Sequence, residues 1–266
     1  MKQDFKIMGV INVTPDSFSD GGKYLNTDKA LAQALQLIKQ GAHIIDVGGE
    51  STRPGADVVS IEEEIKRVVP VIQALRKENP NITISIDSSK PAVMSAAIKA
   101  GANFINDVNA LQTEGTLSVA AKSNLPVCLM HKQGKPKTMQ NKPEYRDVLT
   151  QVMDFFEQKV DNCLLAGIKE KNIILDPGIG FGKTLEHNLI LLKNIKMLKS
   201  LGYPILIGVS RKSMIGEILN TEVNDRLYGS LAIAQFAYTQ GAQVFRVHDV
   251  KATSDVLKVT KALLMS

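Results

Sequence analysis

The residues of this sequence that are best suited to chemistry stand directly after short apolar runs. Asp176 is the clearest example, because it ends the run 173–175 and is followed by Pro177. The other runs also end in acids, amides or bases, which are Asn12, Asp46, Asp87, Asn106 with Asp107, His131, Ser210 with Arg211 and Lys212, and Arg246 with His248. Parallel sheets bind ligands at the carboxyl ends of their strands, so these side chains predict one polar pocket. A single strand-end aspartate can also cap a helix, but eight such ends together favour the pocket.

The segment after Asp176 contains three alternating glycines, which are Gly178, Gly180 and Gly182. Glycines allow the backbone to turn sharply and to come close to a flat or anionic ligand. The end of the segment, Gly-Lys-Thr, resembles a phosphate-binding P-loop, but that motif requires a glycine where this chain has Pro177. The dinucleotide pattern Gly-x-Gly-x-x-Gly fails as well, because its third glycine would fall on Lys183.

The elements that must position these residues alternate between strand-like runs and amphipathic segments. The strand-like runs are 6–11, 44–47, 82–86, 104–105, 127–130, 173–175, 205–207 and 244–247. The amphipathic segments include 28–40, 61–77, 92–100 and 147–166. Eight such units predict an α/β protein with a single (β/α)8 barrel of the TIM type over residues 1–266, with long loops at the carboxyl ends of the strands. An open, doubly wound sheet is the alternative.

A weak internal repeat supports this count. A Gly-Ala pair begins at Gly41, Gly101 and Gly241, each time just before a strand-like run. Glycine is the favoured residue for ending a helix, so each pair predicts the junction of a helix and a strand. The second pair follows the first by 60 residues and the third follows the second by 140, which fits two repeat units of about 30 and four of about 35.

The composition excludes several classes of protein. The chain of 266 residues is 44% hydrophobic, so it can bury a full core, and it contains no apolar run of the roughly 18 residues that a membrane span needs. Its start shows no signal-peptide pattern, so we expect a cytoplasmic protein. Cys128 and Cys163 form no Cys-x-x-Cys pair and no Cys/His cluster, which argues against structural zinc. The net charge of +5 is spread among mixed charges, which is typical of an ordinary solvated surface more than of a nucleic-acid-binding surface, and an anionic small substrate is compatible with it.

Three long loops interrupt the alternation, at 13–24, 48–56 and 131–140. Loops of this length in a compact domain are usually lids or binding loops. The first carries a phenylalanine and two acids, and the second combines glycines with one arginine. The three lysines of the third loop favour a solvated rim over ligand contacts.

These loops and strand ends together resemble the dihydropteroate synthase family over nearly the whole chain. The motifs that carry the resemblance are 12–22 (NVTPDSFSDGG), 48–55 (GGESTRPG), 105–108 (INDV), 176–183 (DPGIGFGK), 210–214 (SRKSM) and 246–250 (RVHDV). The resemblance implies a transferase of folate biosynthesis that joins 4-aminobenzoate to a dihydropterin diphosphate, and a target of sulfonamides. It also implies a homodimer through the last helices.

The resemblance assigns the site residues as well. The residues assigned to pterin binding are Asp87, Asn106, Val108, Met130, Asp176, Phe181 and Lys212. The 4-aminobenzoate is assigned Phe18, Thr52, Pro54, Phe181, Lys212 and Ser213. The diphosphate is assigned Asn12, Arg53, Arg246 and His248, with Asn12 acting through a magnesium ion. Asp20, Lys212, Arg246 and His248 are implied to be catalytic.

Elementary chemistry agrees with these assignments. A buried carboxylate such as Asp176 can accept two parallel hydrogen bonds from the amidine-like edge of a pterin. Magnesium prefers phosphate and water oxygens, so the single amide of Asn12 suffices. Asn12 can instead cap a turn, and His248 can instead fill a core.

Two other functions remain open. A pterin-binding methyltransferase domain shares the barrel and the pterin pocket, but it does not need Phe18, Asp20 or the segment 210–213. A catalytically inactive pterin-binding module is the other, and the active residue type at every matching position argues against it.

Overall fold

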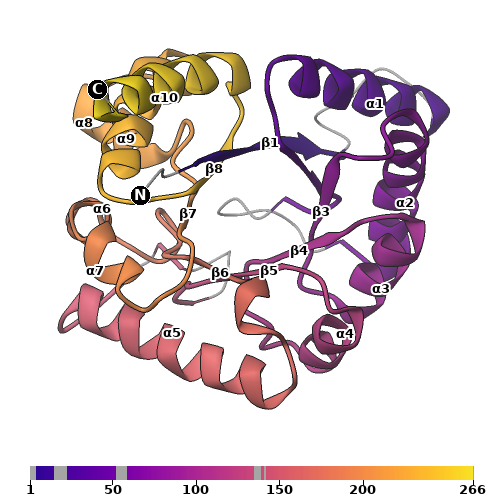
Figure 1. Cartoon of the computed structure of the whole chain (residues 1–266), viewed down its shortest axis with the longest axis horizontal. Helices are drawn as coiled ribbons and strands as arrows, with labels where there is room; N and C mark the ends of the chain where they lie inside the picture. The colour runs from indigo at the N-terminus through magenta and orange to yellow at the C-terminus, as the bar shows by residue number, and fades with distance from the viewer. Residues whose placement is uncertain (1–3, 15–22, 52–58, 135–138, 141, 266) are drawn as a thin grey trace.

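The strands of this protein form one eight-stranded parallel sheet that curves into a barrel (Figure 1). The computed structural model describes residues 4–14, 23–51, 59–134, 139–140 and 142–265. The strands are β1 (Lys6–Asn12), β2 (Ile44–Gly48), β3 (Thr83–Asp87), β4 (Phe104–Asp107), β5 (Val127–Met130), β6 (Ile173–Asp176), β7 (Leu206–Ile207) and β8 (Val244–Val247). These strands confirm the eight predicted from the sequence.

The barrel closes in sequence order. Neighbouring strands run β6-β5-β4-β3-β2-β1-β8-β7, and a single parallel bridge between Leu175 and Ile205 joins β6 to the segment that leads into β7. A doubly wound open sheet would reverse its strand order at a switch point, and this order contains no reversal. The prediction of a (β/α)8 barrel is therefore confirmed, and the open sheet is wrong.

The helices surround the sheet in chain order, as Figure 1 shows from one end of the barrel. They are α1 (Lys23–Lys39), α2 (Ile61–Glu78), α3 (Pro91–Ala100), α4 (Thr116–Ser123), α5 (Val148–Leu165), α6 (Leu185–Lys193), α7 (Ile195–Lys199), α8 (Ser213–Leu219), α9 (Leu227–Thr239) and α10 (Val250–Met265). The first helix begins at Lys23, five residues before the predicted start at Asp28. In the described part of the chain, no helix has the length and apolar character needed to cross a bilayer.

The Gly-Ala repeat marks helix ends, as the sequence predicts. Gly41, Gly101 and Gly241 have φ values of 105°, 116° and 109°, in the left-handed region that favours glycine. In each case the amide of the following alanine donates to the carbonyl five residues earlier, at 2.9 to 3.0 Å. This Schellman arrangement ends the helix and turns the chain back toward the sheet.

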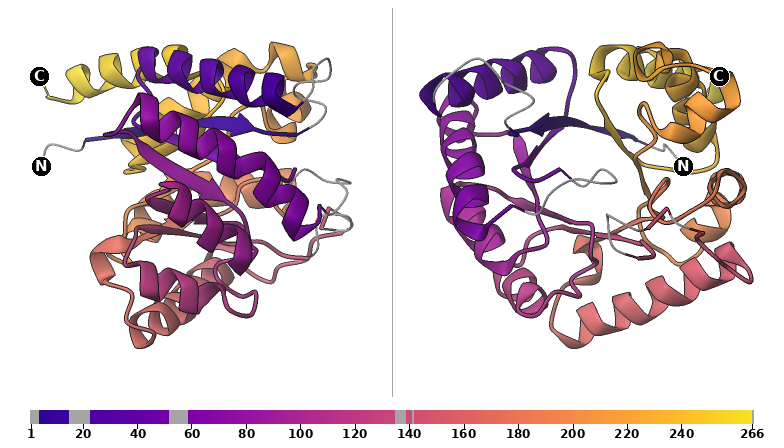
Figure 2. Two further views of the ribbon diagram at one scale, coloured as in Figure 1. Left: turned by 90° about the vertical axis from the view of Figure 1, so that its right-hand side faces the viewer. Right: turned by 180° about the vertical axis from the view of Figure 1, so that it is seen from behind.

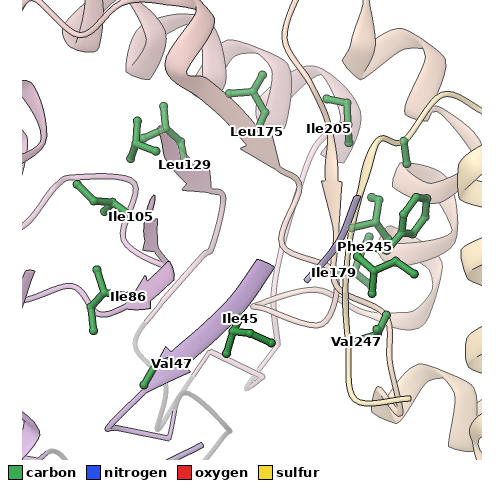
Figure 3. Packing of buried hydrophobic residues seen from close by; sticks show 14 of the residues in the cluster. Ile45, Val47, Ile86, Ile105, Leu129, Leu175, Ile179, Ile205, Phe245 and Val247 are labelled. Carbon is green, nitrogen blue, oxygen red and sulfur yellow. The ribbon is translucent and has the colours of Figure 1, made fainter. Parts of the chain in front are cut away.

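Successive strand residues face opposite sides of the sheet, so each strand serves two regions. One set packs outward against the helices, and Figure 3 shows Ile45, Ile86, Ile105 and Leu129 among them. The other set forms a small apolar cluster of strand residues inside the barrel, which we call the floor: Met8, Ile44, Phe104, Cys128, Ile174, Leu206 and Val244. The arrow of β1 in Figure 2 points away from the end at which both chain termini lie, so the carboxyl ends of the strands lie at the opposite end.

Candidate active site at the carboxyl ends of the strands

A pocket lies above the floor, and alternate residues of the strands and of the loops that follow them line it. Asn106 lies two residues after Phe104 of the floor, Asp176 two after Ile174, and Arg246 two after Val244. The pocket is lined by Asp87, Asn106, Val108, Met130, Asp176, Gly178, Ile179, Phe181, Gly208, Ser210, Lys212, Arg246 and His248. All the residues predicted to hold the pterin are therefore together in one place.

Arg246 connects two carboxylates at the base of this pocket. Its Nε donates to Asp46 Oδ2 at 2.7 Å, and its Nη2 donates to Asp87 Oδ2 at 2.6 Å. Burial alone would lower the pKa of Arg246, but the two carboxylates outweigh burial and raise it. Burial raises the pKa of Asp87 to about 7, although the guanidinium beside it favours the charged form.

One carboxylate oxygen of Asp176 accepts a hydrogen bond from the loop that follows it. Its Oδ1 accepts from the backbone amide of Gly178 at 2.8 Å, and the side chain is buried. Burial raises its pKa, while the Gly178 amide and the positive charge of Lys212 act in the opposite direction. The bond to Gly178 fixes the orientation of the carboxylate.

Lys212 reaches across the pocket from the loop after β7. Its Nζ donates to the carbonyl of Ile179 at 2.7 Å and lies 4.1 Å from the centroid of the Phe181 ring. A cation over an aromatic face is attracted to the ring. Burial lowers the pKa of Lys212 to about 8, against the opposing effect of Asp176.

The glycine loop after β6 packs against the chain itself. An added Cβ at Gly178 would lie 1.9 Å from the carbonyl oxygen of His131, and one at Gly182 would lie 2.2 Å from that of Gln133. The sequence predicts that these glycines come close to a ligand. The structure places the close contacts against the segment after β5 instead, because the two loops lie side by side at the pocket rim.

Lys183 holds the glycine loop from within. Its buried Nζ donates to the carbonyls of Gly178 at 2.9 Å and Phe181 at 3.1 Å, and lies 3.0 Å from His131 Nδ1. Burial lowers the pKa of Lys183 to about 7, and burial beside this amine lowers the pKa of His131 to about 3. The sequence predicts no role for Lys183, which stands only in the P-loop-like pattern that Pro177 excludes.

The loops after β7 and β8 are bonded to each other. The backbone amide of His248 donates to Ser210 Oγ at 3.2 Å, and Arg211 forms a two-point ion pair with Asp249 at 2.7 and 3.0 Å. The side chain of His248 is exposed, so the alternative in which it merely fills the core is wrong.

Several predicted residues lie elsewhere. Asn12 is half-buried at the carboxyl end of β1, but it is not among the described residues that line the pocket. Ser213 is exposed at the start of α8 and borders a neighbouring hollow with Lys183 and Thr184. Phe18, Asp20, Thr52, Arg53 and Pro54 lie outside the residues that the structure describes.

Asp46 is a second residue whose role the sequence does not predict. It was recognised only as a polar strand end, yet it is fully buried and accepts from both Arg246 and Asn106. The signal was available, because Asp46 lies two residues after Ile44 of the floor, on the same side of β2.

The donor set suits a metal only together with a ligand. The described part of the chain holds no group of three His, Cys, Asp or Glu side chains that could bind an ion. An amide such as Asn12 with phosphate and water oxygens is a combination that magnesium accepts. The residues present thus fit a magnesium ion that arrives with a diphosphate.

Comparisons with known proteins agree with this geometry. A family model described as pterin binding enzyme matches residues 8–248. The dihydropteroate synthases of Haemophilus influenzae and Escherichia coli are 51% and 50% identical over 97% of this chain, and 93% and 91% of those proteins are covered.

Solved structures extend the similarity to three dimensions. The Yersinia pestis dihydropteroate synthase in a sulfonamide drug complex has a TM-score of 0.94 and 48% identity over 100% of this chain and 96% of that one. The Xanthomonas albilineans enzyme with 7,8-dihydropteroate has a TM-score of 0.91 and 40% identity over 100% and 96%. This chain belongs to the pterin-binding enzyme family and, within it, to the dihydropteroate synthases.

Proposed function

We propose that this protein joins 4-aminobenzoate to (7,8-dihydropterin-6-yl)methyl diphosphate, releasing pyrophosphate and forming 7,8-dihydropteroate. The observation that carries the proposal is the pocket in which the carboxylates of Asp87 and Asp176, the amide of Asn106 and the amine of Lys212 lie together. This set matches the donors and acceptors around a pterin ring. It also rejects rings that would leave these polar groups unpaired.

The pterin lies between the strand ends in this proposal. Asp176 accepts from the amidine-like edge, with Asp87 and Asn106 along the perimeter and Lys212 donating to ring acceptors. Val108, Met130 and Phe181 supply the apolar contacts, which suits their places on the pocket wall. The orientation of Asp176 by Gly178 means that little rearrangement precedes binding.

The diphosphate lies toward Arg246 and His248, where barrel enzymes often bind phosphate. Arg53 is proposed as a further contact from outside the described residues. Magnesium, held by Asn12 and the diphosphate oxygens, would neutralise charge on the leaving pyrophosphate. Arg246 and His248 stabilise the same negative charge from the protein side.

The chemical step needs no strong base. Departure of pyrophosphate leaves a methylene cation that the electron-rich dihydropterin stabilises. The amine nitrogen of 4-aminobenzoate then forms a bond to the methylene carbon and loses one proton to water or to the released pyrophosphate. Asp20 is proposed to face this cation. Phe18, Thr52, Pro54 and Ser213 complete the aminobenzoate pocket, together with the Lys212 and Phe181 pair. We expect sulfonamides to compete at this pocket, because they imitate 4-aminobenzoate in shape and charge.

We also propose that the protein forms a homodimer whose interface is made by the last helices. Helices α9 and α10 pack together. They expose the large apolar residues Tyr228, Phe236, Val259, Leu263, Leu264 and Met265. Exposed apolar surface of this kind marks interaction sites.

Sedimentation of Leu264→Glu should show a monomer, whereas Leu165→Glu, at an exposed position on α5, should leave the dimer intact. Equal sedimentation of the wild-type protein and Leu264→Glu would contradict the proposed interface.

The function is tested by measuring pyrophosphate release from the dihydropterin diphosphate with and without 4-aminobenzoate, in magnesium and in excess chelator. We expect release coupled to dihydropteroate formation, dependent on metal and inhibited by a sulfonamide. Methyl transfer from methyltetrahydrofolate to a corrinoid, without this reaction, would support the methyltransferase alternative. Pterin binding without either reaction would identify an inactive module.

A further inference from the structure

Asp46 lies inside the barrel, two residues after Ile44 of the floor on β2. It is fully buried on β2 and is not among the described residues that line the pocket. Its Oδ2 accepts from Arg246 Nε at 2.7 Å and from Asn106 Nδ2 at 3.2 Å. One oxygen of Asp46 thus contacts a proposed diphosphate ligand and a proposed pterin ligand.

The two bonds constrain their partners in different ways. A carboxylate only accepts hydrogen bonds, so the NH2 group of Asn106 must face Asp46 and its carbonyl oxygen must face away. Arg246 is held by Nε, which leaves its terminal nitrogens as the groups that can change partner. One of them, Nη2, donates to Asp87 Oδ2 at 2.6 Å.

We propose that Asp46 is a positioning residue that holds Arg246 by Nε and fixes the orientation of the Asn106 amide, so that the diphosphate and pterin ends of the substrate are aligned by one buried carboxylate. This inference rests on the proposed function. Because Asp46 holds Nε, the terminal nitrogens of Arg246 are the groups that would bind the diphosphate, and Arg246 keeps its position while they do so.

The matched control for Asp46 is Ser85. Ser85 is the register partner of Asp46 on β3, is equally buried, and its hydroxyl makes no hydrogen bond within the described residues. Ser85→Ala therefore alters the same layer of the barrel without touching Arg246 or Asn106. Thermal unfolding of each variant shows that binding is compared between folded proteins.

The experiment measures affinity for pyrophosphate with magnesium, and separately for 6-hydroxymethyl-7,8-dihydropterin, by calorimetry. We expect Asp46→Ala to weaken both by at least about tenfold, Asp46→Asn to weaken both less, and Ser85→Ala to change neither by more than about twofold. In turnover, Asp46→Ala should raise KM for the pterin diphosphate and leave KM for 4-aminobenzoate unchanged.

Double-mutant cycles separate positioning from general destabilisation. In an Arg246→Gln background, Asp46→Ala should no longer weaken pyrophosphate binding. In an Asn106→Ala background, it should no longer weaken dihydropterin binding, while its effect on pyrophosphate persists. Losses that are the same in every background would overturn the inference. If Asp46→Ala does not fold, the nearly isosteric Asp46→Asn takes its place in the cycles.

Failure of the proposed function gives a different result. If Arg246→Gln alone leaves pyrophosphate affinity unchanged, the proposed role of Arg246 in diphosphate binding is wrong. If Arg246→Gln weakens pyrophosphate but folded Asp46→Ala binds both ligands as the wild-type protein does, only the inference about Asp46 is wrong.

Discussion

The floor of the barrel and the layer directly above it belong to the same strands but have opposite chemistry. The floor contains apolar side chains such as Ile44 and Phe104, whereas two residues further on, four of the strands carry Asp46, Asn106, Asp176 and Arg246. Two residues of a strand span roughly 6.6 Å, so the change from core to site occurs within one side-chain layer.

This difference shows how a barrel separates stability from function. The floor stabilises the folded state by removing apolar surface from water, and any well-packed group of apolar side chains would do the same. The upper layer buries charges, which costs free energy unless each charge is paired. Arg246, between Asp46 and Asp87, supplies that pairing. Mutations in the floor should therefore change the free energy of unfolding, and mutations in the upper layer should change the affinity for substrate.

The largest effect is expected from Phe104→Ala in the floor. Loss of a buried aromatic ring should lower the free energy of unfolding by about 3–5 kcal/mol, because it leaves a cavity among strand residues. Denaturant unfolding measures this loss, and pterin affinity of the folded variant should remain close to that of the wild-type protein. Leu165→Ala, at an exposed position, is the control. A large loss of pterin affinity in folded Phe104→Ala would show that the two layers are not separable.

Asp176→Asn should have the converse effect. The amide oxygen can still accept from Gly178, so the fold should survive, but an NH2 group then faces the donors of the pterin. Loss of a buried charge-assisted pair should weaken pterin binding by about 2–4 kcal/mol, which calorimetry measures. A folded variant with wild-type pterin affinity would remove Asp176 from the binding set.

The upper layer should also respond to pH. The pKa of Asp87, raised to about 7, means that Asp87 gains a proton as the pH falls below that value. The pKa of Lys212, lowered to about 8, means that Lys212 loses its proton as the pH rises above that value. Affinity for a pterin without diphosphate should peak between these values and fall by up to about tenfold per pH unit on either side.

Lys212→Arg keeps the positive charge at high pH, so it should abolish the alkaline decrease and leave the acid decrease unchanged. Persistence of the alkaline decrease in this variant would assign it to another group. Phe104→Ala should change neither the acid decrease nor the alkaline decrease in affinity, since the floor holds no group that titrates in this pH range.

The smallest effect is expected from Cys128→Ser. This change adds a hydroxyl to the floor without a partner, and it should destabilise the protein by about 1 kcal/mol while leaving turnover unchanged. Thermal unfolding checks the first expectation and the pyrophosphate assay checks the second. An unchanged melting temperature would indicate that a water molecule or a neighbouring carbonyl satisfies the hydroxyl.

The sequence predicted the barrel and most of the pocket because both follow from local patterns. Apolar runs that end in polar residues locate Asp176, Lys212 and Arg246 at one end of parallel strands without knowledge of the contacts. The pairing of Arg246 with Asp46 could not be predicted in this way, since the two residues are 200 positions apart and meet only when β1 lies between β2 and β8.

The burial of Lys183 was equally inaccessible to pattern analysis. A lysine that follows three glycines usually lies in solvent, and only the packing of the glycine loop against the segment at His131 surrounds its amine with carbonyls. The true start of α1 at Lys23 was missed because the apolar periodicity begins later, at Leu31.

The single bridge between Leu175 and Ile205 has a consequence for how the molecule can be divided. The turn at Gly202 lies between β6 and β7, and the backbone there has no other group crowded against it. A chain interrupted at this turn would keep all its ladders, because β1 remains paired with β8 and β7 with β8. We expect two separately expressed pieces, 1–201 and 202–266, to assemble into an active enzyme, so that the barrel could be encoded by two genes.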